Sequence, residues 1–504
     1  MPAHHDAPQA SASPCDETRR RYPWWHPHAW SDRLKIVGLL AIAFAVWGWV
    51  DVRLRGTVDP ENPGIHKTDL TVYTEAGAAF FDGRKPYEVT NPRGWGYLYP
   101  PPFAMLLAPL HALPPRAQVL VWFALSVAML YGCYAESVRV ARIVVPDGPQ
   151  NCIFGPIPLW IGWTALVAAT LPALNCLQRG QVGVAKLYLL LLGLRLCLES
   201  RTVARSFAAG CVLALPVVVK LSPIVPVGML VFAQVVATWR AADRSAVLRR
   251  TTALGGGVVF ATVLTLILLP AGAVGWRANL QNLNTWWHAV ALQIADSRDD
   301  SLAGDSSSVR NQSLTNAVER LGNWGHYFFA DGPNDENPMP LRMQGQEFFM
   351  DSPTVKVSLV AVRAAAACLL LVLAYRVGRS RDTLAVAAMF GLACVSTLVL
   401  SPISRGHYYV LLMPAALFAA AWFARKGRIR WAVATVGVPA VLSVTHYVLL
   451  DVAGRVGLLG IGTSLWYAAT CVALAAGVTS GAALAAPTSD DQSDDSIGRR
   501  PMAA

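Results

Sequence analysis

The chain contains a long series of apolar runs, each long enough to cross a lipid bilayer. A helix needs roughly 20 apolar residues to span about 30 Å of hydrocarbon. Only 14% of the 504 residues are charged and 54% are hydrophobic, whereas about a quarter of the residues in soluble domains are charged. The sequence therefore predicts an all-α polytopic membrane protein with about twelve spans, near residues 34–50, 117–138, 157–173, 182–198, 203–219, 223–239, 252–271, 354–375, 383–400, 408–424, 431–449 and 456–478.

Basic residues fall on one side of this predicted membrane. Lys and Arg in short loops stay cytoplasmic, and strict alternation of the spans puts clusters such as Arg19 to Arg21 and Arg249 with Arg250 on the same side. Both termini are then predicted to be cytoplasmic, and two long loops, 51–100 and 272–353, to be extracytoplasmic. The net charge of +11 follows from this topology, so it does not indicate nucleic-acid binding.

Three parts of the chain are predicted. Residues 1–33 form a disordered cytoplasmic tail, residues 34–478 the transmembrane domain, and residues 479–504 a second disordered cytoplasmic tail. The nine cysteines lack the spacing of metal ligands, and most of them lie inside apolar runs, where Cys behaves as a small hydrophobic residue. The sequence thus indicates neither a metal nor a cofactor.

A carboxylate stands out in the first long loop. Asp69 precedes a segment, 70–80, whose apolar spacing predicts a short helix at the membrane interface. Asp is a favoured N-cap residue, so Asp69 is either the cap of that helix or a general base that takes a proton from an attacking hydroxyl. Glu75 is the nearest rival for the second role.

Cationic residues stand at the same predicted side of the membrane. Lys220 lies between two apolar runs at their outer end, against the orientation rule, and such a charge is a functional candidate. Arg405 and His407 follow a Ser-Pro break at the end of another run. An Arg side chain can clamp a phosphate and a His can donate a proton to it, so these residues are candidates for binding an anionic ligand.

Taken in order, the polar motifs resemble those of glycosyltransferase family 87. They are Asp69 in the first outer loop, a Tyr-Pro-Pro step at Tyr99, an Asn-x-x-Gln-x-Gly-Gln turn at Asn175, Lys-x-x-Pro at Lys220, Asn-Gln-Ser-Leu at Asn311, and Ser-Pro-Ile-Ser-x-x-His at Ser401. The resemblance covers roughly residues 34–425. It implies the C-type glycosyltransferase fold, with short interfacial helices in the two long outer loops.

The resemblance also implies an activity and its site. The family uses polyprenyl-phosphate sugars and includes mannosyltransferases, so an inverting transfer of mannose to a lipid or glycan acceptor at the extracytoplasmic face is expected, without a metal. By the resemblance, Asp69 is the catalytic base, and Lys220, Arg405 and His407 bind the donor phosphate. The residues expected to bind substrate are Tyr73, Tyr99, Asn175, Gln178, Gln181, Asn311 and Gln312.

Two alternatives stay open on the sequence. An arabinofuranosyl donor would suit the same residues, because related enzymes use one. A lipid or sugar transporter would also need many spans, but transporters place polar groups near the membrane midplane between internal repeats. Here no repeat is evident and the polar groups gather at one end of the spans.

Overall fold

The computed structural model of the chain is an all-α bundle. It describes residues 38, 41–42, 45–50, 69–91, 96–146, 152–292, 310–322, 352–380 and 382–478, and within them β-pairing is limited to isolated bridges. Among these described residues, eight helices are long and apolar enough to cross a membrane, judged by length and composition, as expected for a multi-pass membrane protein. The predicted tails 1–33 and 479–504 lie outside the described residues.

The longer helices occupy the predicted apolar runs from 117–138 onward. They are α5 (Pro115–Val144), α6 (Leu159–Arg179), α7 (Gly183–Glu199), α8 (Val203–Val219), α9 (Ile224–Thr238), α10 (Arg244–Val263), α17 (Pro353–Arg379), α18 (Thr383–Leu400), α19 (Leu412–Arg425), α20 (Ile429–Val448) and α22 (Leu458–Gly477). A continuous helical stretch, Arg244–Val274, joins α10 to the π-helix η3 (Leu264–Leu268) and to α11 (Leu269–Val274).

Shorter helices fill the connections. They are α3 (Leu70–Phe81), the 3-10 helix η2 (Pro86–Glu88), α4 (Pro101–His111), α12 (Trp276–Trp286), the π-helix η4 (Trp287–Ala291), α15 (Leu314–Gly322), the 3-10 helix η6 (Gly406–Leu411) and α21 (Leu450–Arg455). The segment expected to form an interfacial helix is α3, but nine of its twelve residues are buried, so α3 is enclosed on nearly all sides rather than half-exposed.

Local chemistry explains where several helices begin. Proline stands in the first turn of α4, α5 and α17, where its missing N–H costs nothing because no intrahelical partner exists there. Asp243 accepts a hydrogen bond from the Ala246 N–H at 2.9 Å at the start of α10, and this satisfies an otherwise unpaired donor.

The core of the bundle is formed by α18 and α19, which pack against each other and are buried almost all round. Such helices read as uniformly apolar, because no face meets solvent or lipid. The helix α10 lies at the periphery, packs mainly on α8, and exposes apolar side chains such as Val259 and Phe260. An exposed apolar face of this kind is what a lipid-facing helix requires.

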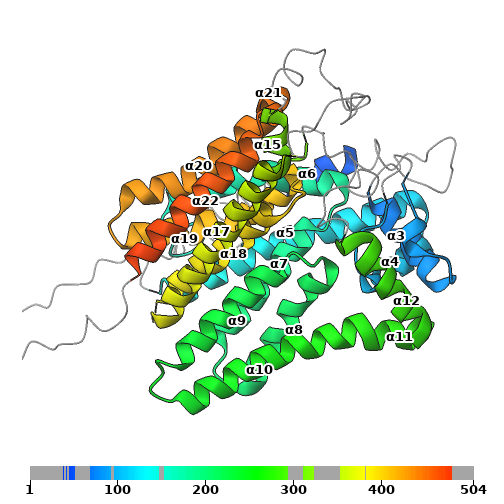
Figure 1. Ribbon diagram of the computed structural model, residues 1–504, viewed down its shortest axis with the longest axis horizontal. Helices are drawn as coiled ribbons and strands as arrows, with labels where there is room; N and C mark the ends of the chain where they lie inside the picture. Colours follow the sequence, from blue (N-terminus) through cyan, green and yellow to red (C-terminus); the bar gives the residue numbers. More distant parts are fainter. Residues whose placement is uncertain are drawn as a thin grey trace, which may run out of the picture.

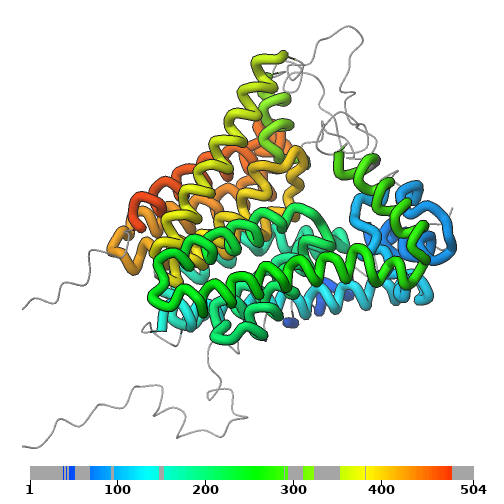
Figure 2. Tube along the Cα trace, turned by 60° about the horizontal axis from the view of Figure 1, so that its bottom comes forward, coloured from blue at the N-terminus to red at the C-terminus, as the bar shows by residue number. Residues whose placement is uncertain are grey.

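Four short helices gather at one end of the bundle. In both views α3 and α4 lie beside α11 and α12 (Figures 1 and 2), and these helices contact one another. The long stretch Arg244–Val274 runs from the opposite end of the molecule to this cluster. The helices α3 and α4 therefore lie at this end of the bundle, next to the ends of α6 and α8.

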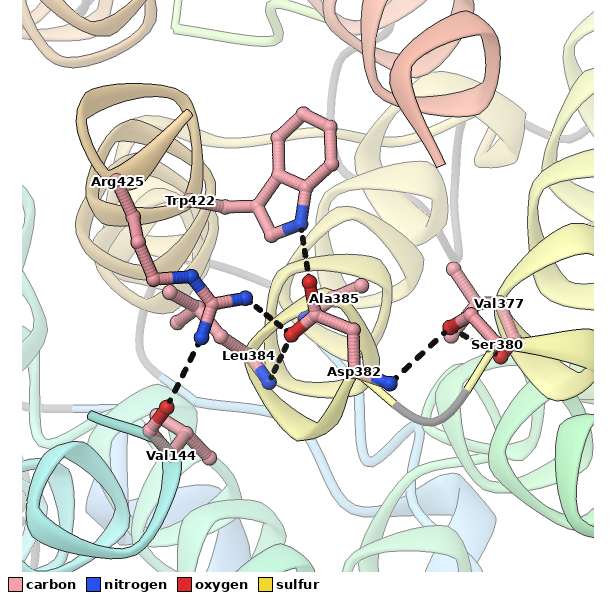
Figure 3. A network of polar contacts seen from close by, with 8 residues as sticks. All are labelled: Val144, Val377, Ser380, Asp382, Leu384, Ala385, Trp422 and Arg425. Carbon is pink, nitrogen blue, oxygen red and sulfur yellow. Dashed lines mark hydrogen bonds and ion pairs between the residues drawn. The ribbon is translucent and has the colours of Figure 1, made fainter. Parts of the chain in front are cut away.

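A polar network holds the opposite ends of α5, α18 and α19 together (Figure 3). The Asp382 carboxylate accepts hydrogen bonds from the N–H groups of Leu384 and Ala385, and so caps α18. It also accepts one from the Trp422 indole at 2.8 Å and forms an ion pair with Arg425 of α19. These contacts fix the ends of α18 and α19 that lie away from α3 and α4. They therefore help to position the other ends of the two helices.

Candidate active site

Asp69 stands immediately before α3, in the position of a cap, but its carboxylate does not cap the helix. Instead it accepts a hydrogen bond from the Gln181 side-chain amide at 2.5 Å, and the Asp69 backbone N–H donates to the Arg179 carbonyl at 3.3 Å. The capping alternative is therefore wrong. Glu75 points elsewhere, since it pairs with His111 at 3.5 Å.

Two tyrosines hold the Gln181 amide in one orientation. The hydroxyls of Tyr73 and Tyr99 each donate to Gln181 Oε1 at 3.3 Å, and they lie 3.0 Å from each other. Burial raises the pKa of both hydroxyls well above its usual value, so both keep their protons. With its oxygen engaged by two O–H groups, Gln181 must turn its NH₂ group toward Asp69.

The turn between α6 and α7 delivers Gln181 to this place. Gly180 ends α6 with a left-handed φ of 68°, a conformation that side chains with a Cβ disfavour. Its carbonyl accepts a hydrogen bond from the Trp122 indole at 2.8 Å. The predicted polar residues Asn175 and Gln178 lie in the last turns of α6, half-buried, at the same end of the bundle.

Lys220 lies in the link between α8 and α9 and reaches Tyr408. Its ammonium donates to the Tyr408 hydroxyl at 2.7 Å, and it stands 4.0 Å from the centre of that ring and 5.8 Å from the centre of the Tyr99 ring. Burial, and then the neighbouring charge of Arg405, lower the pKa of Lys220 to about 7. Tyr99 lies between the Lys220 and Asp69 groups. Its hydroxyl donates to Gln181, which bonds Asp69, and its ring faces the Lys220 ammonium.

A second lysine, Lys186 of α7, approaches the same ring. Its ammonium lies 5.5 Å from the centre of the Tyr408 ring, and the residue is 3% exposed. Lys186 lies inside the apolar run 182–198 and is not among the residues that the motifs point to. The rule that singled out Lys220, an ammonium among membrane spans, applies to it equally.

Arg405 and His407 follow the break at the end of α18, as expected. Arg405 pairs with Asn311 through a backbone bridge. His407 is 2% exposed and its Nε2 has no hydrogen-bond partner among the described residues. The charges of four cations act on His407, namely Arg179, Arg405, Lys220 and Lys186. The site is therefore strongly electropositive, with Asp69 at its margin.

Asn311 and Gln312 are buried and bonded to the protein itself. The Asn311 side-chain oxygen accepts hydrogen bonds from the N–H groups of Ser404 at 3.0 Å and Ser313 at 3.2 Å. The Gln312 amide donates to the Gly454 carbonyl at 3.0 Å, and the Gln312 carbonyl accepts from Tyr409 at 3.0 Å. These contacts join the second long loop to the segment that carries Arg405.

This arrangement combines a carboxylate with a cluster of cationic side chains. A carboxylate fixed by an amide can take a proton from a hydroxyl, and a cluster of cations can stabilise negative charge on a departing group. Within the described ranges, no group of three or more His, Cys, Asp or Glu residues is arranged to hold a metal ion. The described residues suit a reaction in which a hydroxyl attacks the transferred group and an anion departs from it.

The comparison with known families agrees with that chemistry. The sequence profile of glycosyltransferase family 87 matches residues 97–402, more than half of the chain. Asp69 precedes the matched region and Arg405 and His407 follow it, so their roles depend on the geometry described above. No curated protein and no solved structure is detectably similar to the chain.

Proposed function

Because the chain belongs to glycosyltransferase family 87, and is therefore a membrane glycosyltransferase, we propose that it moves a sugar from a polyprenyl-phosphate carrier to an acceptor hydroxyl, with inversion at the sugar carbon. The observation that carries this proposal is the Asp69 carboxylate, held by Gln181 at 2.5 Å beside the cation cluster around Tyr408. Mannose is the proposed sugar, arabinofuranose the alternative, and the acceptor is a lipid or a glycan.

Asp69 is the proposed general base. The acceptor hydroxyl gives its proton to the carboxylate, and its oxygen attacks the sugar carbon from the face opposite the phosphate. The bond between that carbon and the phosphate oxygen breaks, and its electron pair stays on the phosphate. A base of this kind contributes about 10²- to 10⁴-fold in rate.

The donor phosphate is proposed to bind at Lys220, Arg405 and His407. During the reaction the phosphodiester, with one negative charge, becomes a phosphomonoester with two. Cations that are already in place stabilise this developing charge without reorganisation. Tyr73, Tyr99, Gln181, Asn311 and Gln312 contribute to the site by positioning Asp69 and Arg405, and Asn175 and Gln178 are proposed to bind the sugar or acceptor.

The proposed arrangement in the membrane follows the sequence analysis. It has about twelve spans in a C-type glycosyltransferase fold, both termini in the cytoplasm, and the site at the extracytoplasmic face, where lipid-borne donor and acceptor can enter from the bilayer. The reaction as proposed needs no metal or cofactor, because cationic side chains stand where the charge develops. A transporter does not fit a chain of this family.

Substitution of Asp69 by Asn tests the proposal. Asn has the same size and still accepts the hydrogen bond from Gln181, but it cannot accept the proton. The purified variant should fold normally and turn over polyprenyl-phosphate mannose about a hundredfold more slowly or worse. Glu75→Gln is the matched control and should keep its activity. An Asp69→Asn enzyme with near-normal turnover would exclude the assignment, and a parallel assay with polyprenyl-phosphate arabinofuranose decides between the sugars.

A further inference from the structure

Lys186 has a position that the roles assigned above do not explain. It lies in the first turns of α7, is 3% exposed, and has Tyr408, Cys176 and Cys394 among its electrostatic neighbours. Among the described residues, no carboxylate pairs with its ammonium. A buried ammonium without a counter-charge is costly, and an anionic partner from outside the chain would offset that cost.

Lys186 and Lys220 converge on one aromatic ring. Their ammonium nitrogens lie 5.5 and 4.0 Å from the centre of the Tyr408 ring, which puts them within about 10 Å of each other, and the charge of Lys220 acts on Lys186. Like charges at this separation repel more strongly in a buried site than in water. An anion between them would remove that repulsion.

Several cationic groups surround the Tyr408 hydroxyl, so a ligand with more than one negative charge suits this place. The charges of Asp69, Arg405 and Lys186 act on the Tyr408 hydroxyl, and Lys220 donates a hydrogen bond to it. The unpaired Nε2 of buried His407 lies in the same field. A phosphodiester carries one negative charge and can balance one of the two ammonium groups of Lys186 and Lys220, whereas a phosphomonoester carries two and can balance both.

We propose that Lys186, together with Lys220, binds the dianionic lipid phosphate monoester that remains after the sugar has left. This inference rests on the proposed function. When the bond to the sugar carbon breaks, its electrons give the phosphate a second negative charge, and the acceptor proton leaves through Asp69 rather than returning to the phosphate. Lys186 then favours the product state of the carrier over the donor state, and the spent carrier is held more tightly than the donor.

Binding of two small probes tests this directly. Hexyl phosphate is a monoester and hexyl methyl phosphate is a monoanionic diester of the same chain. Titration calorimetry of the purified full chain in detergent is done at pH 6.5, where Lys220 carries its charge and most of the monoester is dianionic, its second pKa being about 6. It should show the monoester binding about tenfold more tightly or better, the effect of one charge-assisted contact. Equal affinities for the two probes in the wild-type protein would overturn the proposal.

Substitutions then assign the preference to Lys186. Lys186→Met should lose about ten- to a hundredfold in affinity for hexyl phosphate and less for the diester, while Lys186→Arg should retain the preference. Lys186→Gln replaces the Met variant if that one does not fold. Lys426→Met, at the far end of α19, is the matched control and should bind as the wild type does. Unchanged monoester affinity in a folded Met or Gln variant would refute the role of Lys186.

A titration with inorganic phosphate distinguishes a site for a lipid-linked phosphate from a site for free phosphate. Inorganic phosphate should bind much more weakly than hexyl phosphate, and equal binding would overturn the assignment to a lipid-linked ligand. These titrations do not depend on turnover. Binding of hexyl phosphate by a protein that cannot use any polyprenyl-phosphate sugar would contradict the proposed function but support the anion site. Normal turnover without a preference for the monoester would support the proposed function but contradict the role of Lys186.

Discussion

At the scale of single residues, the site depends on how one amide is oriented. Gln181 bonds Asp69 through its NH₂ group and the hydroxyls of Tyr73 and Tyr99 through its oxygen. The sequence pointed to all four residues, but it assigned the amide and the tyrosines to the substrate. Their contacts could not be predicted, because they join α3 and the segment before α4 to a turn that lies 82 to 112 residues further along the chain.

Substitution of Gln181 should alter the pH dependence of catalysis. Gln181→Glu places a second carboxylate against Asp69, and two such groups share one proton, which raises the pKa of the pair. The acid limb of the kcat profile should therefore move to higher pH. Gln181→Leu should lower kcat by about ten- to a hundredfold through the lost hydrogen bond. A role in folding alone would leave the profile of a folded Glu variant unmoved.

Lys220 should give the enzyme a second pH dependence. Its pKa is lowered to about 7 in the free protein, so it carries its charge below that pH and loses it above. Donor capture, measured as kcat/KM, should accordingly fall as the pH rises through about 7. Lys220→Arg stays charged over this range and should abolish the fall. If both proteins show the same decline, another group is titrating.

At the scale of the elements, the sequence predicted the long helices well and the breaks between them poorly. Apolar runs such as 354–375 coincide with helices because a lipid environment leaves no other way to satisfy the backbone. The irregular segments are set by contacts between distant loops. Asn311 is an example: the triplet resembled a binding motif, but its side chain accepts hydrogen bonds from the backbone at Ser313 and Ser404.

Loss of the Asn311 side chain should weaken the joint between two segments, the one that carries Asn311 and the one that carries Ser404 and Arg405. Asn311→Ala leaves the N–H groups of Ser313 and Ser404 buried without partners, at a cost of about 1–3 kcal/mol each. We expect a lower unfolding temperature in detergent and a higher KM for the donor, because Arg405 adjoins the joint. Asn311→Asp keeps the acceptor and should lose less. Equal unfolding temperatures for the Ala variant and the wild type would show that the joint does not contribute.

At the scale of the whole molecule, the position of the site follows from one helical stretch. Arg244–Val274 comprises 31 residues, which at about 1.5 Å per residue exceeds the roughly 30 Å of hydrocarbon in a bilayer. Its last part, α11, contacts α3 and α4, and its first residues carry the basic cluster that includes Arg249 and Arg250. The site and this cluster therefore lie at opposite ends of the bundle, a relation that neither the charges nor the motifs could establish alone.

Labelling of engineered cysteines decides which end faces outward. Thr90, beyond α3, and Ser245, at the start of α10, are both exposed, so either accepts a cysteine without disturbing the core. In a background without the nine native cysteines, an impermeant maleimide should label Thr90→Cys in intact cells and Ser245→Cys after permeabilisation only. This outcome is expected because Lys and Arg are retained on the cytoplasmic side. The reverse pattern would put Asp69 and its cation cluster in the cytoplasm, where a donor presented at the outer leaflet could not reach them.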